Sequence, residues 1–239
     1  MAAVQDDRRE NEMCSLLGLR KGVGRSEVDA YCDFEESHCV YSVPVELKST
    51  TTGSVSTARD VGPAHIEKWR RYVWVFGFYD RRGKTLESLL ILGPREMEPW
   101  IAQVELSITP DFALGERASR RLILEDLYAI CDEKLTYSQE DAQKLHKKQW
   151  AKKQYKTQMD LPDGYSPQRM LDILRERSLY LSTRGSTLNN PHIPKTFFAR
   201  LQKYRIGVEQ KTDEEVKQMV WATIRAMALT EQRQDWILK

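Results

Sequence analysis

Cysteine, histidine and long apolar stretches are scarce in this 239-residue chain, and each shortage excludes a class of protein. The histidines form no HxxxH pair and the cysteines form no CxxC pair, so a structural zinc site is not expected. We expect the cysteines to be free thiols in a reducing compartment. No run approaches the roughly 18 apolar residues that a membrane-spanning helix needs. The four cysteines are Cys14, Cys32, Cys39 and Cys131.

Sequence motifs for nucleotide chemistry are also missing. There is no GxxxxGK(S/T) loop and no GxGxxG turn after a strand-like run, so we expect no nucleotide cofactor. The 37 Lys and Arg residues against 35 Asp and Glu give a net charge of +2, which creates no overall basic field that would indicate nucleic acid. The charged start, MAAVQDDRRENE, has no apolar stretch of the kind found in secretion signals. These features favour a cytoplasmic protein that is not bound to a membrane.

The most informative feature that is present is a set of two acids and a lysine. Glu46 and Lys48 are two residues apart in an extended run, so their side chains point to the same face of one strand. Asp29 precedes them on another strand-like run. Carboxylates bind Mg²⁺ through hard oxygen atoms, and a lysine orients or deprotonates water and offsets negative charge in a transition state. Together these side chains are suited to the hydrolysis of a phosphodiester.

The geometry of the turn between the two strands decides which acid joins Glu46. If the loop consists of the two residues Ser37 and His38, Asp29 lies directly opposite Glu46 with their Cβ atoms about 5 Å apart. Asp33 then lies about four residues, roughly 13 Å, farther along the strand and out of reach. This register favours Asp29 as the first metal ligand, whereas a longer turn would leave Asp33 as the alternative.

Asp29 followed by Glu46-Leu47-Lys48 resembles the D…(D/E)xK signature of the PD-(D/E)xK nuclease superfamily, and most closely its type II restriction endonucleases. The resemblance covers roughly residues 10 to 106, where the order helix, strand, strand, helix, strand, strand, helix is similar to the family's core. Val28 stands where the family's name has a proline. The resemblance implies an α/β (α+β) fold with a central mixed sheet flanked by helices, in which Asp29 and Glu46 bind Mg²⁺ and Lys48 positions the attacking water.

The function implied by this resemblance is that of a bacterial or archaeal, Mg²⁺-dependent endonuclease that cleaves double-stranded DNA at a specific sequence. The products would be a 5′-phosphate and a 3′-hydroxyl. Two alternatives stay open: a structure-selective repair or junction-resolving nuclease, and a non-catalytic DNA-binding protein on a nuclease-like core. A homodimer is expected, because a two-fold pair most simply cuts both strands of a symmetric site, and the apolar faces of the C-terminal helices are candidates for its interface.

The chain is expected to have two parts within one compact structure. Residues 1–107 alternate helix and strand patterns and would form the catalytic core. Residues 108–239 are almost entirely helical in pattern and would serve DNA recognition and contact between subunits. The expected helices of this second part are Leu114–Glu133, Ser138–Met159, Pro167–Ser182, Lys195–Tyr204 and Asp213–Trp236.

Several residues near the acids and the lysine are further candidates for the site. Glu12, or Glu10, on the first helix would support a metal-bound water, and the alternative is a solvated glutamate at a helix start. The loop of residues 50–59 offers hydroxyl groups and Arg59 to phosphate oxygens. His65 and Lys68 lie one turn apart on the next expected helix and can face the same site.

Two segments of the second part are candidates for holding and reading DNA. Lys144, Lys148 and Lys152 recur every four residues, and such a stripe would neutralise DNA phosphates unless it is only a solvated face. The loop of residues 183–194 is rich in side chains that pair with base edges, although a plain connection would also contain such turn-forming residues. The base-reading candidates are Arg184, Asn189, Asn190 and His192.

Overall fold

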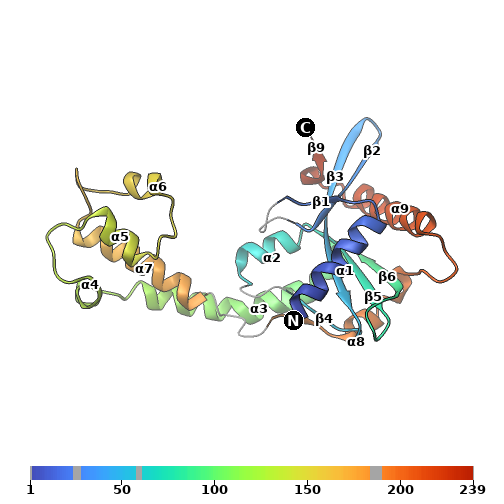
Figure 1. Cartoon of the computed structure of the whole chain (residues 1–239), viewed down its shortest axis with the longest axis horizontal. Coiled ribbons are helices and arrows are strands. Elements are labelled where there is room, and N and C mark those ends of the chain that lie inside the picture. The colour runs from blue at the N-terminus through green and yellow to red at the C-terminus, as the bar shows by residue number, and fades with distance from the viewer. Residues whose placement is uncertain (1, 24–27, 58–60, 184–189, 239) are drawn as a thin grey trace. The chain divides into compact units, whose positions relative to one another are not determined.

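The computed structural model describes residues 2–23, 28–57, 61–183 and 190–238, and it divides into two units (Figure 1). The first, here called the sheet unit, comprises residues 1–58, 63–105 and 190–239. The second, the helical unit, comprises residues 59–62 and 106–189. The expected division at residue 107 therefore differs from the structure, because the last 50 or so residues return to the sheet unit instead of staying with the helices.

A mixed β-sheet forms the centre of the sheet unit, as the sequence predicted. Within the described residues it has seven strands in the order β1-β2-β3-β5-β6-β8, with β9 paired to β3. β3 and β5 are parallel, and the other neighbours are antiparallel. The strands are β1 (Arg20–Lys21), β2 (Ala30–Glu36), β3 (Cys39–Thr50), β5 (Val73–Tyr79), β6 (Leu86–Leu92), β8 (Arg205–Gly207) and β9 (Ile237–Leu238). β4 (Val55–Ser56) and β7 (His192–Ile193) form a separate antiparallel pair.

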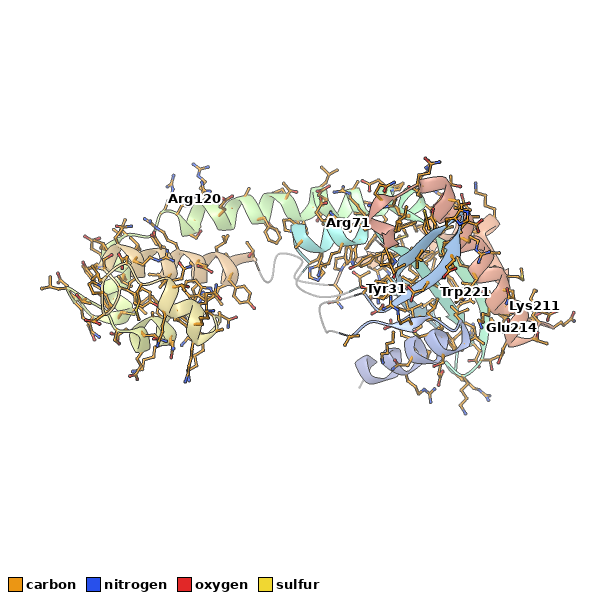
Figure 2. The ribbon with its side chains drawn as sticks, turned by 90° about the horizontal axis from the view of Figure 1, so that it is seen from above. Tyr31, Arg71, Arg120, Lys211, Glu214 and Trp221 are labelled. Carbon is orange, nitrogen blue, oxygen red and sulfur yellow. The ribbon has the colours of Figure 1, made fainter. Side chains whose placement is uncertain are left out.

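Helices cover both faces of this sheet, because alternate residues of its strands are apolar on each side. On one face, Val45 and Val75 pack with Met13 of α1 (Ala2–Leu16) and Val220 of α9 (Asp213–Glu231). Trp221 of α9 also donates a hydrogen bond to the Leu17 carbonyl at the end of α1 (2.7 Å; Figure 2).

The other face of the sheet carries aromatic side chains. Trp74 packs against Trp69 of α2 (Pro63–Trp69) and against Trp100 of α3 (Pro94–Ser119), with ring centres 5.7 and 6.0 Å apart. Phe76 packs at 4.9 Å against Phe198 of α8 (Lys195–Ala199). This face is therefore the one on which α2, α3 and α8 lie.

The C-terminal part of the chain is less helical than its pattern predicted. The expected helices Lys195–Tyr204 and Asp213–Trp236 stop early, and the residues that follow them form β8, β9 and the 3₁₀ turns Gln202–Tyr204 and Gln234–Trp236. The apolar stripe of α9 is buried in the core of its own chain through Val216, Val220, Ile224 and Ala228. This stripe of α9 is therefore used within its own chain, and the expected homodimer stays a prediction.

Where the structure describes it, the helical unit contains the rest of α3, from residue 106, together with four further helices. These are α4 (Leu124–Cys131), α5 (Gln139–Leu145), α6 (Lys152–Thr157) and α7 (Pro167–Thr183). They enclose an aromatic core that includes Tyr137, Tyr155 and Tyr165. The predicted helix Pro167–Ser182 is confirmed, whereas Leu114–Glu133 and Ser138–Met159 are each interrupted by turns. No helix in the described ranges is both long enough and apolar enough to cross a membrane.

Gly77 of β5 faces Met13 of α1, and its substitution tests this packing. A Cβ atom at Gly77 would lie 2.3 Å from the Met13 sulfur and 3.0 Å from the Tyr79 ring, and Met13 is fully buried. We expect Gly77→Ala to lower the free energy of unfolding by about 1–3 kcal/mol through overpacking. Gly207→Ala is the matched control, because nothing lies within 4 Å of its Cβ position. Equal urea midpoints for the two variants would contradict this account.

Candidate active site

The hairpin of β2 and β3 has the register that the sequence predicted. Ser37 and His38 form its two-residue turn with φ angles of 49° and 67°, as a type I′ turn requires. The pairing runs from Glu36 opposite Cys39 to Ala30 opposite Val45. Asp29 is the next residue before β2, so it reaches the level of Glu46 on β3.

Four oxygen atoms surround the ammonium of Lys48. Its Nζ lies 3.0 Å from Glu46 Oε1, 3.2 Å from Asp29 Oδ2 and 3.5 Å from Glu10 Oε1. It also donates a hydrogen bond to the Leu47 carbonyl at 2.7 Å. The Asp29 and Glu46 oxygens therefore lie no more than twice 3.2 Å apart, which is compatible with two ligands of one metal ion.

The backbone of β3 helps to fix Asp29 in this position. From Glu46 onward, β3 pairs with β5 but no longer with β2. The Leu47 amide, which would otherwise lack a partner on that edge, donates a hydrogen bond to Asp29 Oδ2 at 2.9 Å. The carboxylate thus completes the edge of the strand and faces the ammonium at the same time.

Asp33 is held elsewhere and does not join Glu46 and Lys48. Arg20 binds its carboxylate with two nitrogen atoms, and the Ser42 hydroxyl donates to it at 2.7 Å. The Arg20 guanidinium keeps the pKa of Asp33 below its usual value. Arg20 also stacks on Tyr31, with its guanidinium carbon 4.4 Å from the ring centre.

The acid that α1 contributes is Glu10 and not Glu12. Glu12 is half exposed and pairs with Arg8 at 3.3 Å on the outer side of the helix. Glu10 lies one turn before the buried residues Met13 and Cys14, and its side chain is only 20 % exposed. The helical period alone distinguishes the two acids, since Glu10 shares the apolar face of α1 and Glu12 does not.

Burial and mutual repulsion set the ionisation of this cluster. Glu46 and Lys48 lie beside the fully buried Trp74 and Phe76 on β5, and each is only 14 % exposed. Burial raises the pKa of Glu46, and it raises that of Glu10 to about 7, although Lys48 partly offsets both shifts. Burial alone would lower the pKa of Lys48, but the three carboxylates outweigh it and raise that pKa. The cluster therefore sets three carboxyl groups against one ammonium that keeps its proton.

A hydroxyl-rich cleft of about 190 Å³ opens beside Lys48 and Glu10. Thr50 shapes its wall, because its hydroxyl donates to the Ser54 carbonyl at 2.7 Å and accepts from the amides of Thr52 and Gly53. Arg9, which the sequence analysis did not single out, is buried in the wall and donates to Ser49 Oγ at 2.9 Å. The remaining lining residues are Thr51 and Ser56.

The described end of the proposed base-reading loop lies beside this cleft. His192 pairs with Ser56 in the β4–β7 ladder, and the Thr57 amide donates to the Pro191 carbonyl at 2.9 Å. The side chain of His192 is exposed, and that of Asn190 is partly buried. Arg59, Arg184 and Asn189 lie outside the described residues.

The other predicted contacts lie on α2 and in the helical unit. His65 and Lys68 lie on α2, and the His65 ring packs at 6.3 Å against Trp69, which contacts the neighbour of Glu46, Trp74. Lys148 and Lys152 belong to the helical unit. Tyr72, which the sequence analysis missed, is half buried, and burial together with the nearby charge of Glu46 raises its pKa to about 12.

Comparison with protein-family models gives no match for this chain, and comparison with curated proteins gives none either. Its function is therefore inferred from the geometry described above.

Glu10 should make the stability of the protein depend on pH. The unfolded chain loses this proton near pH 4.5, whereas the folded protein retains it up to about pH 7, so stability falls as the pH rises between these values. Between these pH values we expect the free energy of unfolding of Glu10→Gln to fall less than that of wild type, by on the order of 2–3 kcal/mol. Urea unfolding with a chelator present measures this difference. Part of the slope should persist, since the pKa of Glu46 is raised too.

Glu12→Gln is the matched control for this experiment, because it removes an exposed acid from the same helix. A pH profile of Glu10→Gln that coincides with those of wild type and Glu12→Gln would contradict the assigned burial of Glu10.

Proposed function

We propose that this protein is a Mg²⁺-dependent endonuclease of the PD-(D/E)xK superfamily that cleaves double-stranded DNA at a specific sequence, as type II restriction endonucleases do. The observation that carries the proposal is the convergence of Asp29, Glu46 and the Leu47 carbonyl on Lys48 at the open edge of β3. A hydroxyl-lined cleft next to this cluster supports it, because phosphate oxygens accept hydrogen bonds from such groups.

The donor set fits Mg²⁺ in its chemistry. Asp29, Glu46 and the Leu47 carbonyl offer hard oxygen atoms, and the cluster has an excess of buried carboxyl groups that a cation would offset. No three His, Cys, Asp or Glu side chains among the described residues form a ready metal site, and the Lys48 ammonium lies among the carboxylates. Mg²⁺ commonly takes only one or two carboxylates and keeps several waters, so three are not required. When bound, it would act as a Lewis acid toward the phosphate and lower the pKa of a coordinated water.

Each residue of the cluster has a role that follows from its position. Lys48 keeps its proton, because the surrounding carboxylates raise its pKa, and so its Nζ positions the attacking water and offsets charge on the phosphate oxygens. Glu10 lines the cleft next to Lys48, and in this proposal its carboxylate oxygen would take the proton of that water. Arg9 and the threonine and serine hydroxyls of the cleft would hold the phosphate in line for attack.

Incubation of the purified protein with plasmid DNA and Mg²⁺ tests the proposed reaction class. Discrete linear fragments are expected from a sequence-specific enzyme. Cleavage confined to branched or damaged DNA would instead favour the repair or junction-resolving alternative. DNA binding without any cleavage would favour the non-catalytic one, and absence of both would overturn the proposal.

Conservative substitutions in the cluster should abolish cleavage without loss of the fold. We expect Asp29→Asn, Glu46→Gln and Lys48→Gln each to slow plasmid cleavage at least about 100-fold, because each removes a charge aimed at the reacting phosphate. Duplex binding by Lys48→Gln should persist. Asp33→Asn is the control, since Asp33 is held by Arg20 and Ser42 away from the site and should retain near wild-type cleavage. Loss of activity in Asp33→Asn with activity retained in Asp29→Asn would reverse the assignment.

The segment beside the cleft should affect which sequence is cut. His192 and Asn190 lie next to the strand that borders the cleft, and a base contact discriminates by roughly 1–3 kcal/mol. We therefore expect Asn190→Ala and His192→Ala to reduce the preference for the cognate site about 5- to 150-fold in cleavage of a randomised target library, with binding of unrelated DNA intact. Thr196→Ala, an exposed change four residues beyond His192, is the control. An unchanged preference would show that this segment only connects the two units in sequence.

A further inference from the structure

The helical unit contains a lysine-rich groove that plays no part in the cluster around Lys48. Residues 144–156 contain six lysines and no Asp or Glu, in a chain whose net charge is only +2. Five of these lysines line a groove of about 940 Å³, together with two glutamines and one glutamate. They are Lys144, Lys148, Lys152, Lys153 and Lys156.

An interruption of the expected helix creates this groove. A continuous helix over residues 138–159 would have placed Lys144, Lys148 and Lys152 on a convex stripe. Instead α5 ends at Leu145 and α6 begins at Lys152 (Figure 1), and the chain between them reverses through Lys147 and Lys148 with φ angles of 55° and 58°. Left-handed backbone costs about 1–2 kcal/mol per residue outside glycine, so the rest of the unit must stabilise this turn.

An aromatic cluster beneath the turn provides that stabilisation. The buried His146 ring lies 4.4 Å from Trp150, and its Nδ1 is 3.3 Å from the Tyr155 hydroxyl. The Trp150 ring, just before α6, lies 5.2 Å from the ring of Tyr155 within α6. The two helices are therefore held against each other, and the lysines on both are directed at one concave surface.

The positive charge of this groove is mostly unneutralised. Within the described ranges, Lys144 is the only lysine of the groove that has an ion-pair partner, Glu140 at 3.1 Å, and both side chains are more than two-thirds exposed. The other four have exposed side chains that are free to meet an anion. Unpaired lysines at close spacing repel one another, and a bound polyanion would remove that cost.

We propose that this groove binds the phosphate backbone of DNA independently of its sequence. Every residue that lines it has a charged or amide side chain, whereas a membrane-binding surface would also present large aliphatic or aromatic side chains for insertion. Lysines act as flexible point charges that suit a row of phosphates, whereas a site for a single phosphorylated residue favours the fixed fork of arginine. The choice of DNA as the nucleic acid rests on the proposed nuclease function. Because the two units share one chain, DNA held here would also be concentrated around the cluster of the sheet unit.

Binding of a fluorescent DNA duplex by the full chain, measured with a chelator present so that no cleavage occurs, tests this inference. In Lys148→Gln/Lys152→Gln/Lys156→Gln we expect affinity at low salt to fall at least about tenfold, and the slope of log K against log salt to fall by about two to three. The matched control is Arg117→Gln/Arg121→Gln/Lys147→Gln, which removes the same charge from exposed positions of the helical unit outside the groove. It should keep the wild-type slope.

Equal slopes for the two triple variants would overturn the inference, and so would unchanged DNA binding with loss of binding to anionic phospholipid vesicles. Circular dichroism of both variants verifies that the helical unit remains folded. The outcome is independent of the cleavage assay. If the groove binds DNA but the protein never cuts it, only the proposed nuclease function is refuted. If the protein cuts DNA but the groove variant binds DNA normally, only this inference is refuted.

Discussion

The ammonium of Lys48 is the interaction on which the rest of the site depends. Carboxyl groups from three separate segments lie within 3.5 Å of it: Glu10 on α1, Asp29 before β2 and Glu46 on β3. Burial raises the pKa of Glu10 and of Glu46, and the charge of Lys48 partly offsets both shifts. One buried positive charge therefore holds together the ends of elements that lie far apart in the sequence. Under the proposed function, the three carboxyl groups around a single ammonium would accept a further cation.

β3 connects this electrostatic arrangement to the fold. It is paired with β2 and β9 over its first half and with β5 over its second half, so that one edge becomes free at Glu46. A free edge inside a protein leaves backbone groups that need partners, and the Leu47 amide finds one in Asp29. Where β3 no longer pairs with β2, the side chain of Asp29 takes the place of the missing strand. The same side chain belongs to the cluster around Lys48. Gly77 on the adjacent strand lets α1 approach closely enough for Glu10 to reach this edge.

Local patterns predicted much of this arrangement. The two-residue turn at Ser37 and His38 fixed the hairpin register, and the register fixed that Asp29, and not Asp33, would lie beside Glu46. The helical period of α1 was sufficient to separate Glu10 from Glu12, although the sequence interpretation did not use it. The expected stripe of lysines along one helix is not present, because a period of four residues forms a stripe only on a continuous helix, and the chain is interrupted between α5 and α6. The aromatic packing of His146, Trp150 and Tyr155 outweighs the helical preference of Lys147 and Lys148.

By itself the sequence determined the mixed sheet with its flanking helices, the strand that carries Glu46 and Lys48, and the turn that sets their partner, because periodicity and turn chemistry act over a few neighbouring residues. Only the tertiary structure decided that the C-terminal strands return to this sheet, that α9 covers it, and that Arg9 lines the cleft. It also decided that the lysines of α5 and α6 face a groove. These features depend on contacts between residues far apart in the chain, whose energies exceed the local preferences that a sequence pattern records.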